Sequence, residues 1–173
     1  MEAREIMLYS YEHCEGFLQK GLEGLTQKEA AWQYNEECNS IAWILWHFTR
    51  GEDNRVNALI LHEREVFEKE GWQEKLGIPV PLSDRGAGNT LEQVKAWHKH
   101  VPKLELLKAY HNSVYKKTVD YIKSATPEKL SEVTDPGSNL PTAGLILARR
   151  LGENAMHIGH ICFLRGIQRG FNK

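Results

Sequence analysis

Four long stretches of this chain place apolar residues at the spacing of an amphipathic helix, and no long stretch alternates with the period of a strand. The stretches cover residues 2–20, 40–65, 102–124 and 142–169. Each such helix must bury its apolar stripe against a neighbour, and four helices can bury their stripes together. The sequence therefore predicts an all-α protein built as a four-helix bundle.

The connections between the long helices contain start signals for short helices. Thr26 with Glu29, and Thr90 with Gln93, have the spacing of a capping box, in which side chains satisfy free backbone N–H groups. We therefore expect short extra helices in the connections. Residues 70–90 are rich in glycine and proline and are predicted to form a long irregular connection. Loops of that length are often functional, so this one is a candidate substrate wall.

The length and charge of the chain restrict its domain count and its partners. A chain of 173 residues suits one domain with a buried core, and we assign residues 1–173 to a single domain. The 22 basic and 23 acidic side chains leave a formal net charge of -1. Proteins that bind nucleic acid or anionic membranes usually carry a basic excess, so we expect neither partner.

The sequence also lacks signals for a membrane span, export and disulfide bonding. No apolar run approaches the ~20 residues that span a bilayer, and the acidic N-terminal stretch has no apolar segment of a signal peptide. The three cysteines, Cys14, Cys38 and Cys162, are an odd number without CxxC spacing. Such cysteines are typical of reduced thiols, so we expect a cytoplasmic location.

Polar residues interrupt the apolar faces of two predicted helices. At ~100° per residue, His157 lies about 40° from Glu153, and His160 lies about 20° from it on the other side. His47 likewise lies on the apolar face of the second long helix. A buried carboxylate costs much free energy unless a cation or several hydrogen bonds compensate it.

His47, Glu153 and His157 are therefore candidates to hold one divalent cation between facing helices. Two imidazoles and one carboxylate leave a position open for water or substrate, which is typical of catalytic metal sites. These ligand types suit Zn, Ni, Fe or Mn. The alternative interpretation is a hydrogen-bonded His/Glu network without metal, because short motifs of this kind are often accidental.

Two segments around these residues resemble the DinB/YfiT-like superfamily of metalloenzymes. Residues 39–53, which contain His47 and Arg50, are similar to the second helix of that family. Residues 153–166 are similar to its last helix, where many members carry HxxxHxGQ followed by an apolar stretch and Leu-Arg-Gly. The two segments occur in the family's order and at its separation, and the resemblance covers most of the chain.

The resemblance implies a set of metal ligands. Glu153 stands where many members have a histidine, and the branch of mycothiol-dependent maleylpyruvate isomerase also has Glu there. The implied ligands are therefore His47, Glu153 and His157. His160 replaces a glutamine of many members and is implied as a fourth ligand, a residue behind the ligands or a substrate contact. In our hypothesis, Arg50 or His160 orients the reacting anion or stabilises its charge.

The same resemblance implies an up-up-down-down order of the bundle helices and a homodimer. Characterised relatives include isomerases and transferases that use low-molecular-weight bacterial thiols, and hydrolase-like proteins. We therefore expect a divalent-metal-dependent enzyme that activates a water or a low-molecular-weight thiol for attack on a small electrophilic substrate. The competing hypothesis is a non-catalytic bundle, with a structural metal or none, that binds a small molecule or acts in a stress response.

Overall fold

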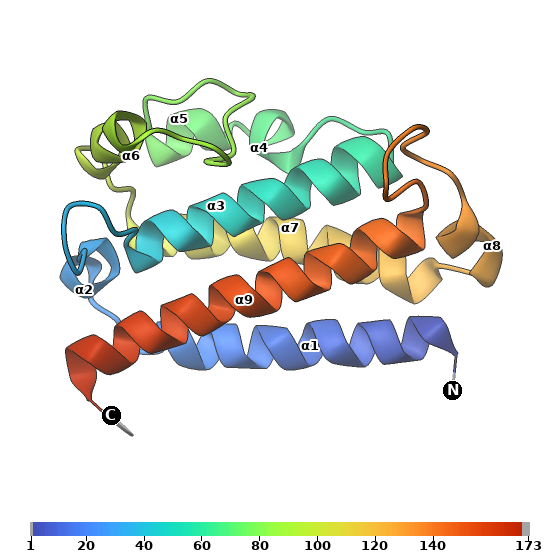
Figure 1. Cartoon of the computed structure of the whole chain (residues 1–173), viewed down its shortest axis with the longest axis horizontal. Helices are drawn as coiled ribbons and strands as arrows, with labels where there is room; N and C mark the ends of the chain where they lie inside the picture. The colour runs from blue at the N-terminus through green and yellow to red at the C-terminus, as the bar shows by residue number, and fades with distance from the viewer. Residues whose placement is uncertain (1, 171–173) are drawn as a thin grey trace.

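Four long helices form a bundle in the computed structural model, which describes residues 2–170 (Figure 1). They are α1 (Ala3–Leu22), α3 (Ile41–Asp53), α7 (Leu104–Ser124) and α9 (Ala143–Arg169). Within the described residues, β-type pairing is limited to an isolated antiparallel bridge between Val133 and Thr142. The predicted all-α four-helix bundle is therefore confirmed.

Short helices occupy the connections, as the sequence predicts. They are α2 (Gln27–Ala31), α4 (Val66–Lys69), α5 (Trp72–Leu76), α6 (Leu91–His98) and α8 (Pro127–Ser131). The hydroxyls of Thr26 and Thr90 accept the expected capping hydrogen bonds at the starts of α2 and α6. The glycine- and proline-rich connection is less irregular than predicted, because α5 forms within it.

The second long helix ends earlier than predicted and changes its winding. A π-helix, η1 (Asn54–Ile60), continues α3 directly, so the helical path stops at Ile60 instead of the mid-sixties. His62 then adopts a φ of 52°, in the left-handed region that does not continue a right-handed helix. The chain turns back at this point and covers α3.

The directions of the long helices differ from the implied up-up-down-down order. The early residues of α1 and α9 meet, since the Tyr11 hydroxyl donates to the Leu147 carbonyl at 3.1 Å. Later residues of the same helices also meet, since Gly21 lies against Ile161. The helices α1 and α9 are therefore parallel, which Figure 1 also shows.

The helices α3 and α7 are parallel to each other and run opposite to α1 and α9 (Figure 1). Thr49 hydrogen-bonds with His111, and one turn later Glu52 accepts from Thr118. The observed order is thus up-down-down-up, and the implied order is wrong. The physical reason is the long connection over residues 61–103, which returns along α3 so that α7 starts at the same end of the bundle.

The helix α3 lies at the centre of the packing. Each of its residues is buried except His47 and Gly51. The helices α7 and α9 pack along α3, and the connection that contains α4, α5 and α6 covers another side (Figure 1). None of the helices in residues 2–170 is long and apolar enough to cross a membrane.

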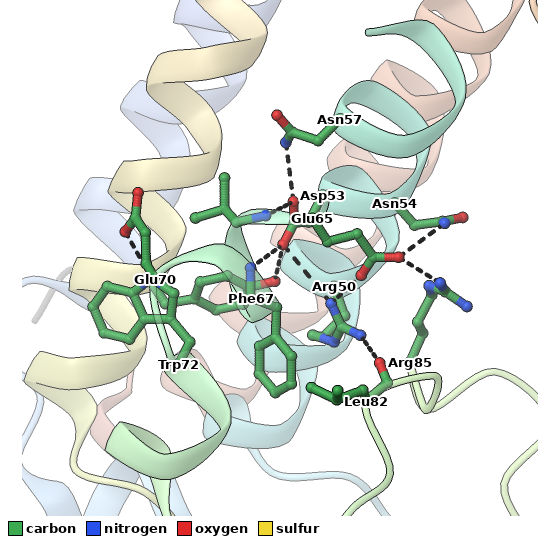
Figure 2. A network of polar contacts seen from close by, with 12 residues as sticks. Arg50, Asp53, Asn54, Asn57, Glu65, Phe67, Glu70, Trp72, Leu82 and Arg85 are labelled. Atoms are coloured by element: carbon green, nitrogen blue, oxygen red, sulfur yellow. Dashed lines mark hydrogen bonds and ion pairs between the residues drawn. The ribbon is translucent and has the colours of Figure 1, made fainter. Parts of the chain in front are cut away.

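Asp53, at the end of α3, is a buried carboxylate that fastens the connection to the bundle (Figure 2). One of its oxygens accepts from the backbone N–H of Val66, and the other accepts from that of Phe67, both at 2.8 Å. The side chains of Asn57 and Tyr110 also donate to it. Burial raises the pKa of Asp53, although these hydrogen bonds oppose the shift. Asp53 thereby holds the start of α4 against α3 and α7.

Arg50, one turn earlier on α3, fastens the far part of the same connection. Its guanidinium is fully buried and donates to the carboxylate of Glu65 at 2.5 Å. It also donates to the carbonyl oxygen of Leu82, at 2.5 Å (Figure 2). A further hydrogen bond, of 3.3 Å, goes to the carbonyl oxygen of Asp84. A buried guanidinium needs such acceptors, because its charge cannot be left unpaired away from water.

Replacing Asp53 with Asn tests whether Asp53 anchors the connection. The substitution keeps the size of the side chain but replaces one acceptor oxygen with an NH₂ donor. The new amide faces other donors and leaves Arg50 without one of its charged neighbours. We expect D53N to lower the free energy of unfolding by about 3 kcal/mol in urea denaturation at neutral pH.

The matched control is D120N on α7. Asp120 is 54% exposed and pairs with Lys116 at the surface, so this variant should keep the wild-type urea midpoint. Equal midpoints for D53N and the control would show that Asp53 does not anchor the connection.

Candidate functional site

His47 lies on α3 with its imidazole oriented by the connection that covers the helix. Its Nδ1 is 2.5 Å from the backbone carbonyl oxygen of Arg85. A carbonyl oxygen only accepts hydrogen bonds, so Nδ1 carries the proton and Nε2 keeps its lone pair. Gly86 permits this approach: its φ is +79°, and a Cβ there would lie 2.8 Å from His47 Nδ1.

His157 on α9 faces His47 across the space between the two helices. The ring centroids are 5.0 Å apart with the rings nearly perpendicular, and His157 also stacks on Phe48. Burial, together with the neighbouring His47 and Arg150, lowers the pKa of His157 to about 4. Burial is also the main cause that lowers the pKa of His47. Both imidazoles are therefore neutral near pH 7, with lone pairs available.

Glu153 lies one turn before His157 but is bonded to arginines. Arg149 Nε donates to one carboxylate oxygen at 2.7 Å, and Arg150 donates to the other. Burial acts to raise the pKa of Glu153, yet the hydrogen bond from Arg149 and the charge of Arg150 bring it below the ordinary value. The carboxylate is therefore ionised at neutral pH and compensated by two cations.

Arg150 is buried because α3 leaves room for it. A Cβ on Gly51 would lie 3.1–3.3 Å from the guanidinium atoms, so glycine at this position allows the close packing. The guanidinium also donates to the carbonyl of Phe48 and to the side chain of Asn154. Asn154 in turn donates to the buried carboxylate of Glu52. This series of hydrogen bonds joins α9 to α3 next to the site.

Two hollows meet at the imidazole pair. The first has a volume of about 430 Å³ and a polar lining that includes His47, Arg55, Arg85, Arg149, Glu153 and His157. The second, of about 380 Å³, is more apolar and is lined in part by Trp43, Ile44, His47, His157, His160 and Leu164. His47 and His157 belong to both linings and are therefore within reach of a molecule in either hollow.

The residues present fit a divalent cation in part. Two neutral imidazoles and a carboxylate on one cavity are the donor types that a transition metal takes in catalytic sites. The proton on His47 Nδ1 is held by a backbone carbonyl, as is usual for a metal-binding histidine. In the described part of the chain, however, no three His, Cys, Asp or Glu side chains are grouped to hold a metal ion. Glu153 is instead engaged by Arg149 and Arg150.

The remaining sequence-predicted residues have distinct positions. His160 is exposed on α9 and lines the apolar hollow, with its ring 5.8 Å from that of His157. Arg50 is fully buried and does not line the cavity that contains Glu153. It acts through the connection, because it binds the carbonyls of Leu82 and Asp84, just before Arg85, whose own carbonyl orients His47.

Sequence reasoning missed the arginines of this site. Arg149 and Arg150 precede Glu153 by one helical turn, a spacing that signals ion pairs on a helix. That signal was available in the sequence. No sequence signal placed Arg55 and Arg85 on the same cavity, because η1 and the connection that carry them meet only in the folded chain.

Comparison with known proteins gives a family and a fold. A family model described as the DinB superfamily matches residues 11–161. A solved structure described as a conserved protein from Enterococcus faecalis is similar over 99% of both chains, with a TM-score of 0.85 and 22% identity. At that identity the likeness concerns the fold alone. A search of the curated proteins found no match.

The low pKa of His157 predicts a pH dependence of stability. Between its folded pKa of about 4 and the ordinary value of 6.5, the unfolded chain binds a proton that the folded chain does not. Stability therefore falls as the pH is lowered through this window. We expect H157Q to lose less unfolding free energy than the wild type between pH 6.5 and about 4.5. Urea denaturation at both pH values measures the difference.

The exposed His100 supplies the control, and H100Q should lose as much stability as the wild type over this range. If H157Q does the same, His157 is not held neutral by the fold.

Proposed function

Because the chain belongs to the DinB superfamily, whose model matches residues 11–161, we propose that it is an enzyme that uses a divalent transition metal, Zn, Ni, Fe or Mn. The observation that carries the proposal is the facing pair of neutral imidazoles, His47 and His157, on the wall of a cavity. A satisfied core histidine needs no cavity beside it, whereas a ligand to a catalytic cation needs room for a substrate.

His47, His157 and Glu153 are the proposed ligands. His47 offers Nε2, because its Nδ1 proton is held by the Arg85 carbonyl. His157 makes no hydrogen bond through its ring nitrogens within the described residues, so it needs no rearrangement to bind a cation. Glu153 joins them when it gives up a hydrogen bond to Arg149 or Arg150.

Held by these residues, a divalent cation would supply Lewis acidity, which lowers the pKa of a water or thiol and so favours a nucleophile at neutral pH. The substrate class that follows is a small electrophile, with a low-molecular-weight thiol or water as its partner. The cavity of about 430 Å³ is of the size that holds such molecules. Arg149, once released by Glu153, is placed at the cavity wall to stabilise negative charge on the reacting group.

One observation favours the competing function of a non-catalytic, small-molecule-binding bundle. The ion pairs of Glu153 with Arg149 and Arg150 already compensate its charge, so a metal-free network is self-consistent. A structural metal, in turn, would take a closed shell of four ligands and would recruit His160. The variant H160A separates these cases, since a catalytic site retains its metal without His160 and a closed structural site does not.

The experiment that tests the proposal is elemental analysis of the purified, tag-free protein and of single variants. We expect about one equivalent of a transition metal in the wild type and none in H47A or H157A, because two ligands rarely hold such an ion. H100A, which removes an exposed histidine, should keep the metal. E153H should retain or tighten binding, because imidazole does not form the ion pairs that compete with the cation.

The proposal fails if both H47A and H157A retain the wild-type metal content. It also fails if the wild type takes up no metal when titrated with Zn²⁺, Ni²⁺ or Fe²⁺. A positive result justifies assays with bacterial thiols and electrophiles on the same variants.

A further inference from the structure

The polar cavity beside the imidazole pair is strongly cationic. Its lining contains the guanidinium groups of Arg55, Arg85, Arg149 and Arg150, and Glu153 is the carboxylate among its lining residues. Four positive charges against one negative charge leave an excess of three on the lining. Glu65 lies outside the lining but pairs with Arg85, and counting it still leaves an excess of two. The chain as a whole has a net charge of -1, so this cavity differs from the rest of the molecule.

Two of these arginines have donors free for a ligand. Arg55, in the first turn of η1, is exposed, and its guanidinium makes no hydrogen bond or ion pair with any other residue in the range 2–170. Arg149 is 55% exposed and uses its Nε for Glu153, which leaves its terminal amino groups unpaired. Guanidinium groups in this state match the paired oxygens of a carboxylate or phosphate.

Arg85 and Arg150 add to the excess of donors on this wall. The Nε atoms of Arg85 and Arg150 are buried and have no acceptor among the described residues. Their guanidinium groups are held in place by other contacts: Arg85 by Glu65, and Arg150 by the Phe48 carbonyl. They therefore contribute fixed positive charge to the cavity, while the exposed arginines supply movable donors.

The apolar hollow begins where the cationic cavity ends, at the same two imidazoles. Trp43 stacks on His47 with ring centroids 4.8 Å apart and forms part of the hollow's wall. Ile44 and Leu164 add aliphatic surface to it. A molecule that spans both hollows would have a charged end among the arginines and an apolar body beyond the imidazoles.

We propose that the substrate of this site is a small oxyanion-bearing molecule with an apolar body. Arg55 and Arg149 bind the carboxylate or phosphate, and the apolar body passes His47 and His157 into the hollow beside Trp43. That this molecule is a substrate rests on the proposed function. Its binding does not, because binding requires the arginines and not the metal.

Glu153 competes with the ligand for Arg149 and Arg150. Its carboxylate occupies donors of both guanidinium groups and carries the negative charge of the lining. Removing that charge with E153Q therefore frees donors and raises the positive potential of the cavity. An anion should bind this variant more tightly, whereas a neutral ligand should not, and a merely structural role of Glu153 predicts no such gain.

The test is isothermal titration of the full-length, chelator-treated protein with benzoate, phenyl phosphate and benzamide. Benzamide keeps the shape of benzoate without its charge. We expect both anions to bind at least about tenfold more tightly than benzamide, and the tighter anion identifies the oxyanion that the site prefers. Binding of the anions should weaken as ionic strength rises, because the partly exposed arginines are screened by salt.

Single variants locate the binding in the cavity. R55Q and R149Q should each weaken benzoate binding about tenfold, and E153Q should strengthen it several-fold. The control R4Q removes an exposed arginine on α1 that pairs with Glu2, and it should leave binding unchanged. Equal affinities for benzoate and benzamide, or equal effects of R149Q and R4Q, would overturn the inference.

The outcome is independent of the metal experiment. Anion binding by metal-free protein that also takes up no metal supports this inference and rejects the proposed function. Metal uptake without a preference for anions supports the proposed function and rejects this inference. The metal content of R55Q should equal that of the wild type, because Arg55 is not a proposed ligand.

Discussion

The buried charges of Arg50 and Asp53 on α3 are the interactions on which the site depends. Asp53 fastens the start of α4 through two backbone N–H groups, and Arg50 fastens the later part of the same connection through Glu65 and two carbonyls. The anchored segment carries Arg85, whose carbonyl fixes the orientation and the protonated nitrogen of His47. The imidazole is therefore set by a network that lies one and two turns away from it.

Around the imidazole pair, burial and neighbouring charges have opposite effects on the pKa of Glu153. Burial keeps His47 and His157 neutral, because its effect on their pKa values exceeds the opposing effect of the Glu153 carboxylate. The carboxylate of Glu153 stays ionised because two arginines compensate it. In the two kinds of binding proposed above, Glu153 would hold a cation together with the imidazoles, and the arginines that it releases would hold an anion.

The helical spacing of the sequence was sufficient to bring the two histidines together. His47 and His157 each lie on the apolar face of a long helix, and bundle packing turns such faces toward one another. The position of Glu153 on the same cavity follows from its spacing, but its pairing with arginines does not follow from the apolar pattern. Arg50 was expected beside the reacting anion, yet its guanidinium lies under the connection, where the carbonyls of Leu82 and Asp84 accept hydrogen bonds from it.

The sequence by itself determined the class of fold and the helices that carry the ligand candidates, since periodicity and capping residues act over a few positions along the chain. Tertiary structure alone decided the up-down-down-up order, because the long connection returns along α3 instead of crossing the bundle (Figure 1). It also decided the cationic cavity, which joins arginines from η1, the connection and α9. Charged residues that are distant in sequence come close in space only when packing brings their helices together. No local sequence pattern encodes that proximity.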